Sequence, residues 1–138
     1  MDILKPLDNQ MQLLSKVLDL RAEKAQVISA NIANAETPGY SPSIFDFEKD
    51  LSNAIKKTGS IELTTSHNGH IPLGPAGFNS VIGKITEAPN RAAIGDENGV
   101  SVEQEMIALS ENEILYETST QLLNKKLSLL KHVISGGQ

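Results

Sequence analysis

Two long stretches of this chain contain neither proline nor glycine, and they run over residues 7–37 and 100–135. The segment between them, residues 41–99, holds seven of the ten glycines and four of the six prolines. Proline and glycine are the least favourable residues in a helix interior, so their absence allows long helices and their clustering interrupts them. The distribution therefore predicts two long helices toward the ends of the chain, around an irregular middle.

Apolar residues in the first stretch recur in steps of four and three, which is the heptad pattern of a coiled-coil seam. Only Arg21 interrupts this seam, and a second apolar stripe runs beside it. A helix with two apolar faces needs more than one neighbour. The seam residues are Leu4, Leu7, Met11, Leu14, Leu18, Ala25, Ile28 and Ile32, and the second stripe is Leu13, Val17, Leu20 and Val27.

The second stretch carries signals for both helix ends. Ser101 followed by Gln104 fits a capping box at the start, and Gly136 is suited to a left-handed stop after the end. All acids of this helix precede all its lysines, an order that opposes the helix macrodipole. Its predicted seam is Val102, Met106, Leu109, Tyr116, Leu123, Leu127, Leu130 and Ile134, interrupted by Glu113 and Thr120, and its second row is Ala108, Leu115, Leu122 and Leu129.

The middle gives weaker signals. "SIFDFEKDLSNAIKKTG" has Ile44, Phe47, Leu51 and Ile55 at helical spacing, so a short helix ending at Gly59 is expected. "IELTT" and "VIGKIT" are possible short strands. The predicted fold class is mainly α: a single domain over 1–138, with two long terminal helices (about 7–37 and 101–135) paired as a coiled-coil-like hairpin and an irregular segment over 38–99.

Composition excludes several classes of function. The net charge of −5 disfavours nucleic acid as a partner, and the absence of cysteine excludes disulfides and thiolate metal sites. The first ten residues lack the apolar core of a secretory signal, and no stretch is long and apolar enough to predict a membrane span.

Candidate chemistry is sparse. His67 and His70 are the only close histidine pair, but they lie in a glycine-containing loop with no nearby acid to act as a third zinc ligand. The stretch "DENGVSVEQE" fails the spacing of a calcium loop, because Gly99 comes too early and Val100 stands where an oxygen ligand is needed. No catalytic grouping or phosphate-binding loop is present, so we expect no enzyme activity, no cofactor, no metal and no small-molecule substrate.

The most particular stretch is "SANIANAETPGY", residues 29–40. Pro38 predicts that the helix ends near Glu36 or Thr37, and Pro38 with Gly39 predicts a type I or type II turn. Asn31 and Asn34 lie on one helix face, where their amides could bond backbone groups across an interface or cap the helix locally.

This stretch resembles the N-terminal signature of the axial proteins of the bacterial flagellum, the rod, hook and hook-associated proteins. The matching residues are Asn31, Ile32, Ala33, Asn34, Thr37, Pro38, Gly39 and Tyr40, while Glu36 stands where the family often has asparagine. The last forty residues, with Glu105, Met106, Asn112, Tyr116 and "LLNKK", are similar to the C-terminal helix of rod proteins. The segment between the helices is too short for the large inserted domains of hook and distal-rod members. The stretches "DFEKDL" and "LLNKKLSLLK" are most similar to the proximal part of the rod family.

The resemblance implies a structural subunit of the flagellar basal-body rod that assembles through its terminal helices and has a role in motility. Its implied partners are other rod subunits and neighbouring basal-body and export-apparatus proteins. Its implied location is the rod across the periplasm, reached by the flagellum's type III export without a cleaved signal peptide. The alternative is a soluble helical adaptor or chaperone that binds a partner helix. The residues expected at assembly contacts are Ile28, Asn31, Ile32, Asn34, Pro38, Gly39, Tyr40, Leu109, Tyr116, Leu123, Leu127 and Leu130.

Overall fold

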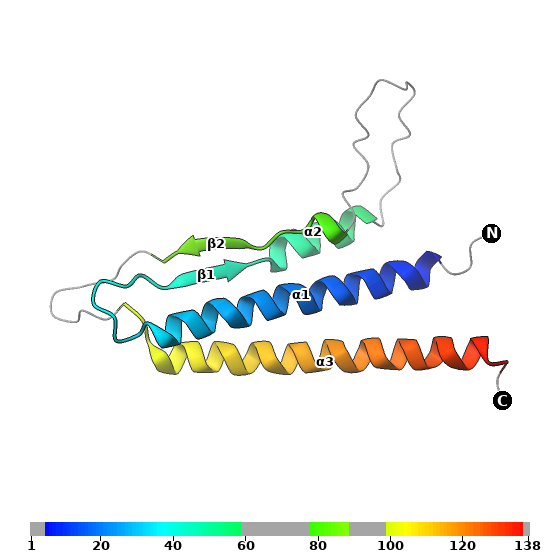
Figure 1. Cartoon of the computed structure of the whole chain (residues 1–138). Coiled ribbons are helices and arrows are strands. Elements are labelled where there is room, and N and C mark those ends of the chain that lie inside the picture. Colours follow the sequence, from blue (N-terminus) through cyan, green and yellow to red (C-terminus); the bar gives the residue numbers. More distant parts are fainter. Residues whose placement is uncertain (1–4, 59–77, 89–98, 137–138) are drawn as a thin grey trace, which may run out of the picture.

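The computed structural model of the chain describes residues 5–58, 78–88 and 99–136, and its elements are shown in Figure 1. The elements are, in order, α1 (Lys5–Ala33), β1 (Ser43–Asp46), α2 (Glu48–Thr58), the 3₁₀ helix η1 (Phe78–Ser80), β2 (Lys84–Glu87) and α3 (Val102–Ile134). The two terminal helices dominate the fold, which confirms the mainly α prediction. At 1.5 Å per residue, α1 and α3 are about 44 and 50 Å long.

The long helices run antiparallel, so that the start of α1 and the end of α3 lie at the same end of the molecule (Figure 1). The short elements β1, β2 and α2 cover the side of α1 that faces away from α3. The fold therefore has three layers with α1 in the middle. This arrangement explains the two apolar stripes of α1, because one neighbour is α3 and the other is the middle segment of the same chain.

Helix α1 begins two residues before the predicted start and ends at Ala33, earlier than the predicted position near Thr37. Pro6 lies in its first turn, where a missing backbone N–H costs nothing. At the other end, the Nδ2 group of Asn34 donates to the carbonyl of Ala30 at 2.8 Å. The backbone N–H of Asn34 donates to the same carbonyl at 3.1 Å, so the side-chain amide adds a second bond to the last helical one. The helix thus ends at the asparagines, before the proline.

Both ends of α3 follow the sequence signals. The hydroxyl of Ser101 accepts a hydrogen bond from the backbone N–H of Gln104 at 3.5 Å, which is the N-cap interaction of a capping box. At the far end, Gly136 has a φ of +74°, the left-handed conformation expected of a glycine that stops a helix.

The middle segment is partly a sheet where a helix was expected. Strands β1 and β2 pair antiparallel, with Phe45 opposite Ile85. The prediction that Ile44 belongs to the short helix is wrong, because Ile44 lies in β1 and α2 begins at Glu48. The predicted strand "VIGKIT" overlaps β2 and is confirmed in part, whereas "IELTT" and Gly59 lie outside the described residues.

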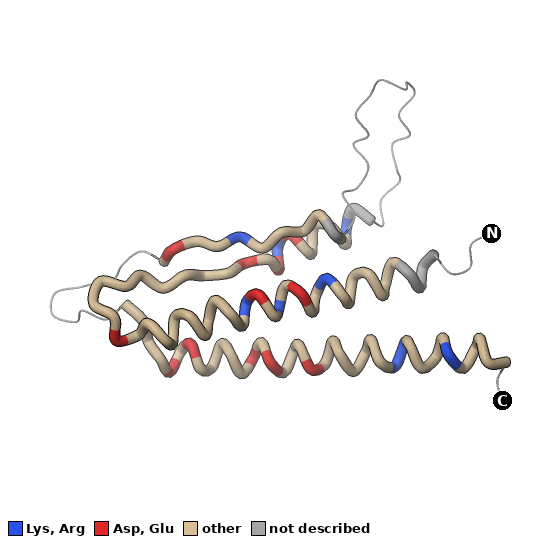
Figure 2. Tube along the Cα trace, in the orientation of Figure 1, with Lys and Arg blue, Asp and Glu red and all other residues tan. Residues whose placement is uncertain are grey.

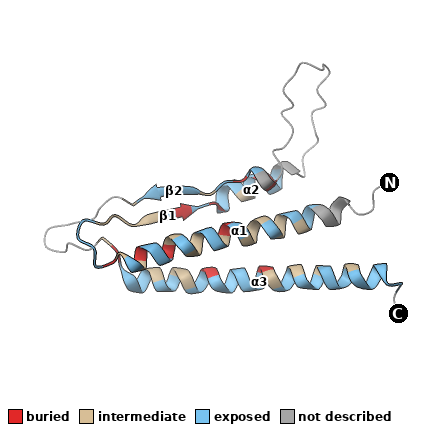
Figure 3. Cartoon of the chain, in the orientation of Figure 1, coloured by how far each residue is buried: buried red, intermediate tan, exposed pale blue. Residues whose placement is uncertain are grey.

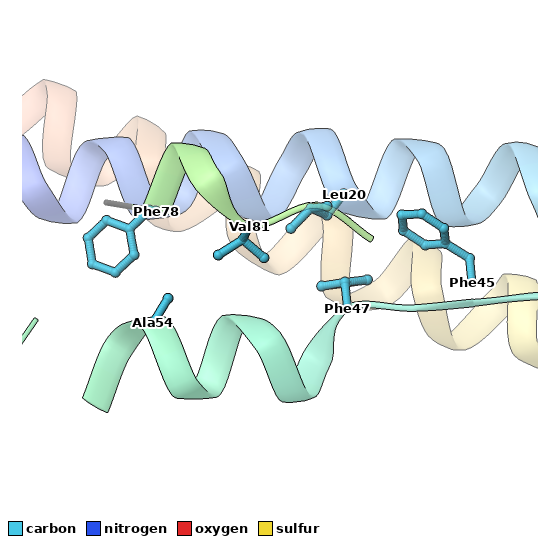
Figure 4. Close-up of a cluster of buried hydrophobic side chains, with 6 residues drawn as sticks. All are labelled: Leu20, Phe45, Phe47, Ala54, Phe78 and Val81. Carbon is cyan, nitrogen blue, oxygen red and sulfur yellow. The ribbon is translucent and has the colours of Figure 1, made fainter. Parts of the chain in front are cut away.

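The main hydrophobic core lies between α1 and the middle segment, as Figure 4 shows. All three phenylalanines of the chain belong to it. The buried members of this core are Leu20, Phe45, Phe47, Ala54, Phe78 and Val81. Gly83 allows the ring of Phe45 to approach, because a Cβ on residue 83 would lie 1.8 Å from the ring Cζ.

Candidate assembly surfaces

The turn after α1 is held by the amide of Asn31, which is only 1% exposed. Its Nδ2 donates to the carbonyl of Ser43 at 2.8 Å, and its Oδ1 accepts from the backbone N–H of Ser43 at 2.9 Å. The same Oδ1 accepts from the hydroxyl of Tyr40 at 3.1 Å. Every hydrogen bond that a neutral amide oxygen normally accepts is therefore made, and the bonds fix the start of β1 against the end of α1.

Between Asn31 and β1 the chain reverses at Pro38 and Gly39. The backbone N–H of Tyr40 donates to the carbonyl of Thr37 at 3.2 Å, and Gly39 has a φ of +75°. A positive φ at the third residue with proline at the second is the pattern of a type II turn. Of the two predicted turn types, the geometry therefore selects type II.

The two asparagines of the signature have different roles. Asn34 acts locally, since it caps Ala30 and its Oδ1 accepts from the Thr37 hydroxyl at 3.4 Å. Asn31 acts over a longer range and joins two elements of the same chain. Ile32 is half-buried beside them, and Ile28 is buried one turn earlier. These signature residues thus shape the end of the subunit where α1 gives way to β1.

A polar pair lies at the centre of the contact between α1 and α3. Nη1 of Arg21 donates to Oδ1 of Asn112 at 3.2 Å, and Nδ2 of Asn112 donates to the carbonyl of Arg21 at 2.8 Å. The guanidinium carbon also lies 5.5 Å from the centre of the Phe47 ring, within cation–π range. Arg21, which interrupts the apolar seam, is thus the residue that joins all three layers.

The polar pair changes which face of α3 points to α1. The two buried residues of α3 are Asn112 and Ser119, which are seven positions apart and so share a face. This face lies between the two predicted apolar rows of α3. Helix α1 consequently covers one edge of each row, and the prediction that one whole row forms the seam is wrong.

The predicted assembly residues of α3 divide accordingly. Leu109, Leu123 and Leu130 are half-buried on the side that faces α1. Tyr116 and Leu127 are exposed, by 42% and 44%. Leu109, Tyr116, Leu123 and Leu130 are seven positions apart, so they follow one stripe of the helix, with Leu127 beside it. In the single chain, α1 covers this stripe only in part.

Most apolar side chains of α3 remain exposed outside the strip that α1 covers, and Figure 3 colours most of this helix as exposed. The exposed set extends over the whole length of the helix, and we call it the open face of α3. Its residues are Val102, Met106, Ile107, Ile114, Leu115, Tyr116, Leu122, Leu127, Leu129, Val133 and Ile134. An apolar surface of this extent is typical of a protein that associates with another.

One ion pair joins α1 to the middle segment. The carboxylate of Glu48 accepts from Nζ of Lys24 at 2.7 Å and from the backbone N–H of Phe47 at 3.3 Å. Partial burial raises the pKa of Glu48, but the bonds to Lys24 and to backbone N–H groups, with the charge of Lys24, outweigh it and hold the pKa below its ordinary value. The pair helps to fix the start of α2 on α1.

Reasoning from the sequence missed the partnership of Arg21 and Asn112 and the central place of Phe47. Arg21 was noted as a break in the seam, and that break is the signal that a polar partner should be sought on the facing helix. Asn112 was noted only within the resemblance to rod proteins. Nothing local to the sequence shows that these residues meet, since they are 91 positions apart.

Metal and membrane features are limited in the part of the chain described. Within residues 5–58, 78–88 and 99–136, no group of three or more His, Asp or Glu side chains is placed to hold a metal ion. His67 and His70 lie outside those ranges. Among the described helices, none has the length and apolarity that crossing a membrane requires.

Comparison with known proteins agrees with the resemblance of the signature. A family model described as "Flagella basal body rod protein" matches residues 18–40, which include Asn31 and the turn. The flagellar basal body rod protein FlgB of Salmonella typhimurium is 29% identical over 139 residues, covering 98% of this chain and 99% of that protein. FlgB of Escherichia coli K12 is 29% identical over 142 residues, with the same coverage.

The similarity is stronger over a slightly shorter span in a third relative. FlgB of Aeromonas hydrophila is 33% identical over 123 residues, which cover 88% of this chain and 89% of that protein. Matches of nearly full length mean that the relatives share the short middle as well as the terminal helices. The chain belongs to the FlgB family of flagellar basal body rod proteins.

Proposed function

We propose that this chain is a structural subunit of the flagellar basal-body rod that joins its neighbours through the open face of α3 and the end of α1. Membership of the FlgB family supports the role as a rod subunit. The open face supports the mode of assembly, and it is the observation that carries this part of the proposal. Burying such a face against neighbours would remove a large apolar area from water, at roughly 25 cal/mol per Å².

The residues of the signature have a supporting part in this proposal. Asn31, Gly39 and Tyr40 set the path of the chain from α1 into β1. In a repeating assembly each subunit makes the same contacts, so an error in this path would recur at every contact. We therefore assign them the role of shaping the subunit, and we assign Tyr116 and Leu127 direct contact with neighbours.

The alternative of a helical adaptor is less favoured. An adaptor that clasps one partner helix needs a single apolar groove, whereas the apolar side chains of α3 are spread over its whole outer face. The family also consists of structural proteins, so a catalytic role is not part of the proposal. No cofactor, nucleic acid or small-molecule substrate is required by a structural role.

Membership of the FlgB family supports a location in the flagellar basal body. We further propose that the subunit crosses to its site through the flagellum's own export apparatus, without a cleaved signal peptide, and that the rod it joins spans the periplasm. Other rod subunits and the adjoining basal-body proteins are then its partners.

Deleting the gene and restoring it tests the proposed function. The deletion strain should not swim, and purified basal bodies should lack the rod, while a plasmid copy of the gene should restore both. Immunoblotting of the basal bodies should detect the chain. A deletion strain that swims normally would contradict the proposed function.

A further inference from the structure

The charges of α3 are separated into two halves, which Figure 2 shows as red at one end of the helix and blue at the other. The N-terminal half, residues 102–117, carries only acids, and the C-terminal half, residues 125–134, carries only bases. The acids are Glu103, Glu105, Glu111, Glu113 and Glu117, and the bases are Lys125, Lys126 and Lys131 with His132 beside them. Residues 118–124 between them are uncharged.

This separation is specific to α3. In α1, acids and bases alternate over a short central stretch that contains Lys16, Asp19, Arg21, Glu23 and Lys24. The open face of α3, by contrast, continues across both charged halves, from Met106 in the acidic half to Val133 in the basic half. A partner that covers this face must therefore suit an acidic surface along one half and a basic surface along the other.

A second copy of α3 meets this requirement if it is displaced along the helix axis. Two parallel α3 helices in register place acids beside acids and bases beside bases, which repel. A displacement of fourteen to eighteen residues, about 21–27 Å at 1.5 Å per residue, brings the basic half level with the acidic half. At fourteen residues Lys125 is level with Glu111 and Lys131 with Glu117, and at eighteen Lys131 is level with Glu113. The apolar side chains supply the area for binding, and complementary charges select the alignment.

We infer that, in the assembled state, the basic half of α3 of one subunit lies against the acidic half of α3 of a second subunit, which points in the same direction and is displaced by about half the helix. The inference rests on the proposed function, because the shared direction follows from subunits repeating along an axis. Such a contact is heterologous, because the two subunits use different surfaces. The acidic half of the first subunit and the basic half of the second therefore remain free to bind the next subunits in the row.

Cross-linking tests the displacement, and the chain has no native cysteine to interfere. Ser110, Thr118 and Ser128 are exposed on α3 and serve as cysteine sites. Two differently tagged chains, Ser110→Cys and Ser128→Cys, are expressed together, and the basal bodies are treated with a bis-maleimide that spans two packed helices, about 8–10 Å between axes. The expected product is a dimer that carries both tags.

Single-cysteine strains distinguish the other alignments. A Ser110→Cys dimer with itself means that the helices are in register, and a Thr118→Cys dimer with itself means that they are antiparallel about the middle of α3. Either of these products as the main one would overturn the inference. The inference would also be overturned if no mixed dimer forms although both cysteines react with a monofunctional maleimide, which shows that they are accessible.

Charge reversal tests the complementarity separately. Glu111→Lys with Glu117→Lys, or Lys125→Glu with Lys131→Glu, should each abolish swimming, because one half then repels its neighbour. The combination of all four changes should restore swimming. If the defects came only from weaker helices, the combined variant would be worse than either pair, and that result would contradict the inference.

The two hypotheses fail in different ways. If the gene can be deleted without loss of swimming, the proposed function is wrong whatever the cross-links are. A different result would separate the two: the gene is required and the cysteine variants support swimming, but the mixed dimer does not form. In that case the role as a rod subunit stands and the displaced alignment is wrong.

Discussion

The side-chain amide of Asn31 pairs with both backbone groups of Ser43, at 2.8 and 2.9 Å. In this way a residue of α1 takes the place of a neighbouring strand at the start of β1. The amide of Asn31 is buried and Ser43 is half-buried, so removing the amide would leave the backbone groups of Ser43 with limited access to water in its place. The contact therefore links the end of the long helix to the position of the middle segment.

Asn31→Ala should lower the free energy of unfolding by about 1–3 kcal/mol, because it leaves the half-buried backbone groups of Ser43 without their side-chain partner. Tyr40→Phe removes only the third bond to the same amide and should cost less, about 0.5–1.5 kcal/mol. Urea unfolding of the purified protein measures both. An Asn31→Ala protein as stable as the wild type would show that the pairing contributes nothing to the fold.

Gly39→Val should abolish rod assembly, whereas Gly39→Asn should support swimming. The φ of Gly39 is +75°, and a Cβ there would have no atom within 4 Å, so the cost comes from the backbone and not from a clash. Left-handed conformations cost ordinary residues about 1–2 kcal/mol, with asparagine the most tolerant of them. Complementation on swim plates, with immunoblots for expression, compares the two, and equal swimming would remove the case for a strict turn.

Arg21 and Asn112 should be coupled in a double-mutant cycle. Asn112 is buried and Arg21 is half-buried, and Arg21→Met or Asn112→Leu alone takes a hydrogen-bond partner from the residue that remains, so each change should be destabilising. The double variant should be less unstable than the sum of the two, with a coupling of about 0.5–3 kcal/mol. Arg21→Met removes the contact with Phe47 whether it is made in the wild type or in the Asn112→Leu variant, so the free energy of that contact cancels in the coupling. Strictly additive changes in urea unfolding would show that the two residues do not act as a pair.

Glu48→Gln should weaken the protein slightly at neutral pH and have less effect in acid. The folded pKa of Glu48 lies below its unfolded value, which is about 4.3. The stabilisation is therefore complete above the unfolded pKa and is lost as the pH falls through the folded pKa. Because this pair is partly exposed to solvent, the difference at neutral pH is on the order of 0.2–1 kcal/mol. A difference between wild type and variant that stays constant from pH 7 to about pH 3 would contradict this assignment.

The ends of the helices could be predicted from the sequence where the signals are local. Ser101 and Gly136 act through neighbouring backbone groups, so their roles follow from a few adjacent residues. Pro38 is an obvious stop and predicts an end near Thr37, whereas α1 ends at Ala33. At that point the side chains of Asn34 and Asn31 bond to Ala30 and Ser43, and these bonds are not visible in the local sequence.

Features that depend on distant pairing could not be predicted. Ile44 and Phe47 have helical spacing, but pairing of the segment with β2 makes Ile44 part of a strand. The face of α3 that meets α1 depends on the pairing of Arg21 with Asn112. For the candidate site, the signature identified the turn, whereas the division of α3 into a covered edge and an open face required the fold.

The most direct test of assembly through the open face is a pair of exposed substitutions on α3. Leu122→Gln with Leu129→Gln changes two exposed residues seven positions apart, while Asn124→Gln, at an exposed position that is already polar, is the matched control. Neither variant removes a buried contact, so circular dichroism of both purified proteins should match the wild type. The measurement is the amount of the chain in purified basal bodies. We predict that the leucine variant is exported but absent from rods while the control is present at the wild-type level; normal incorporation of the leucine variant would contradict assembly through this face.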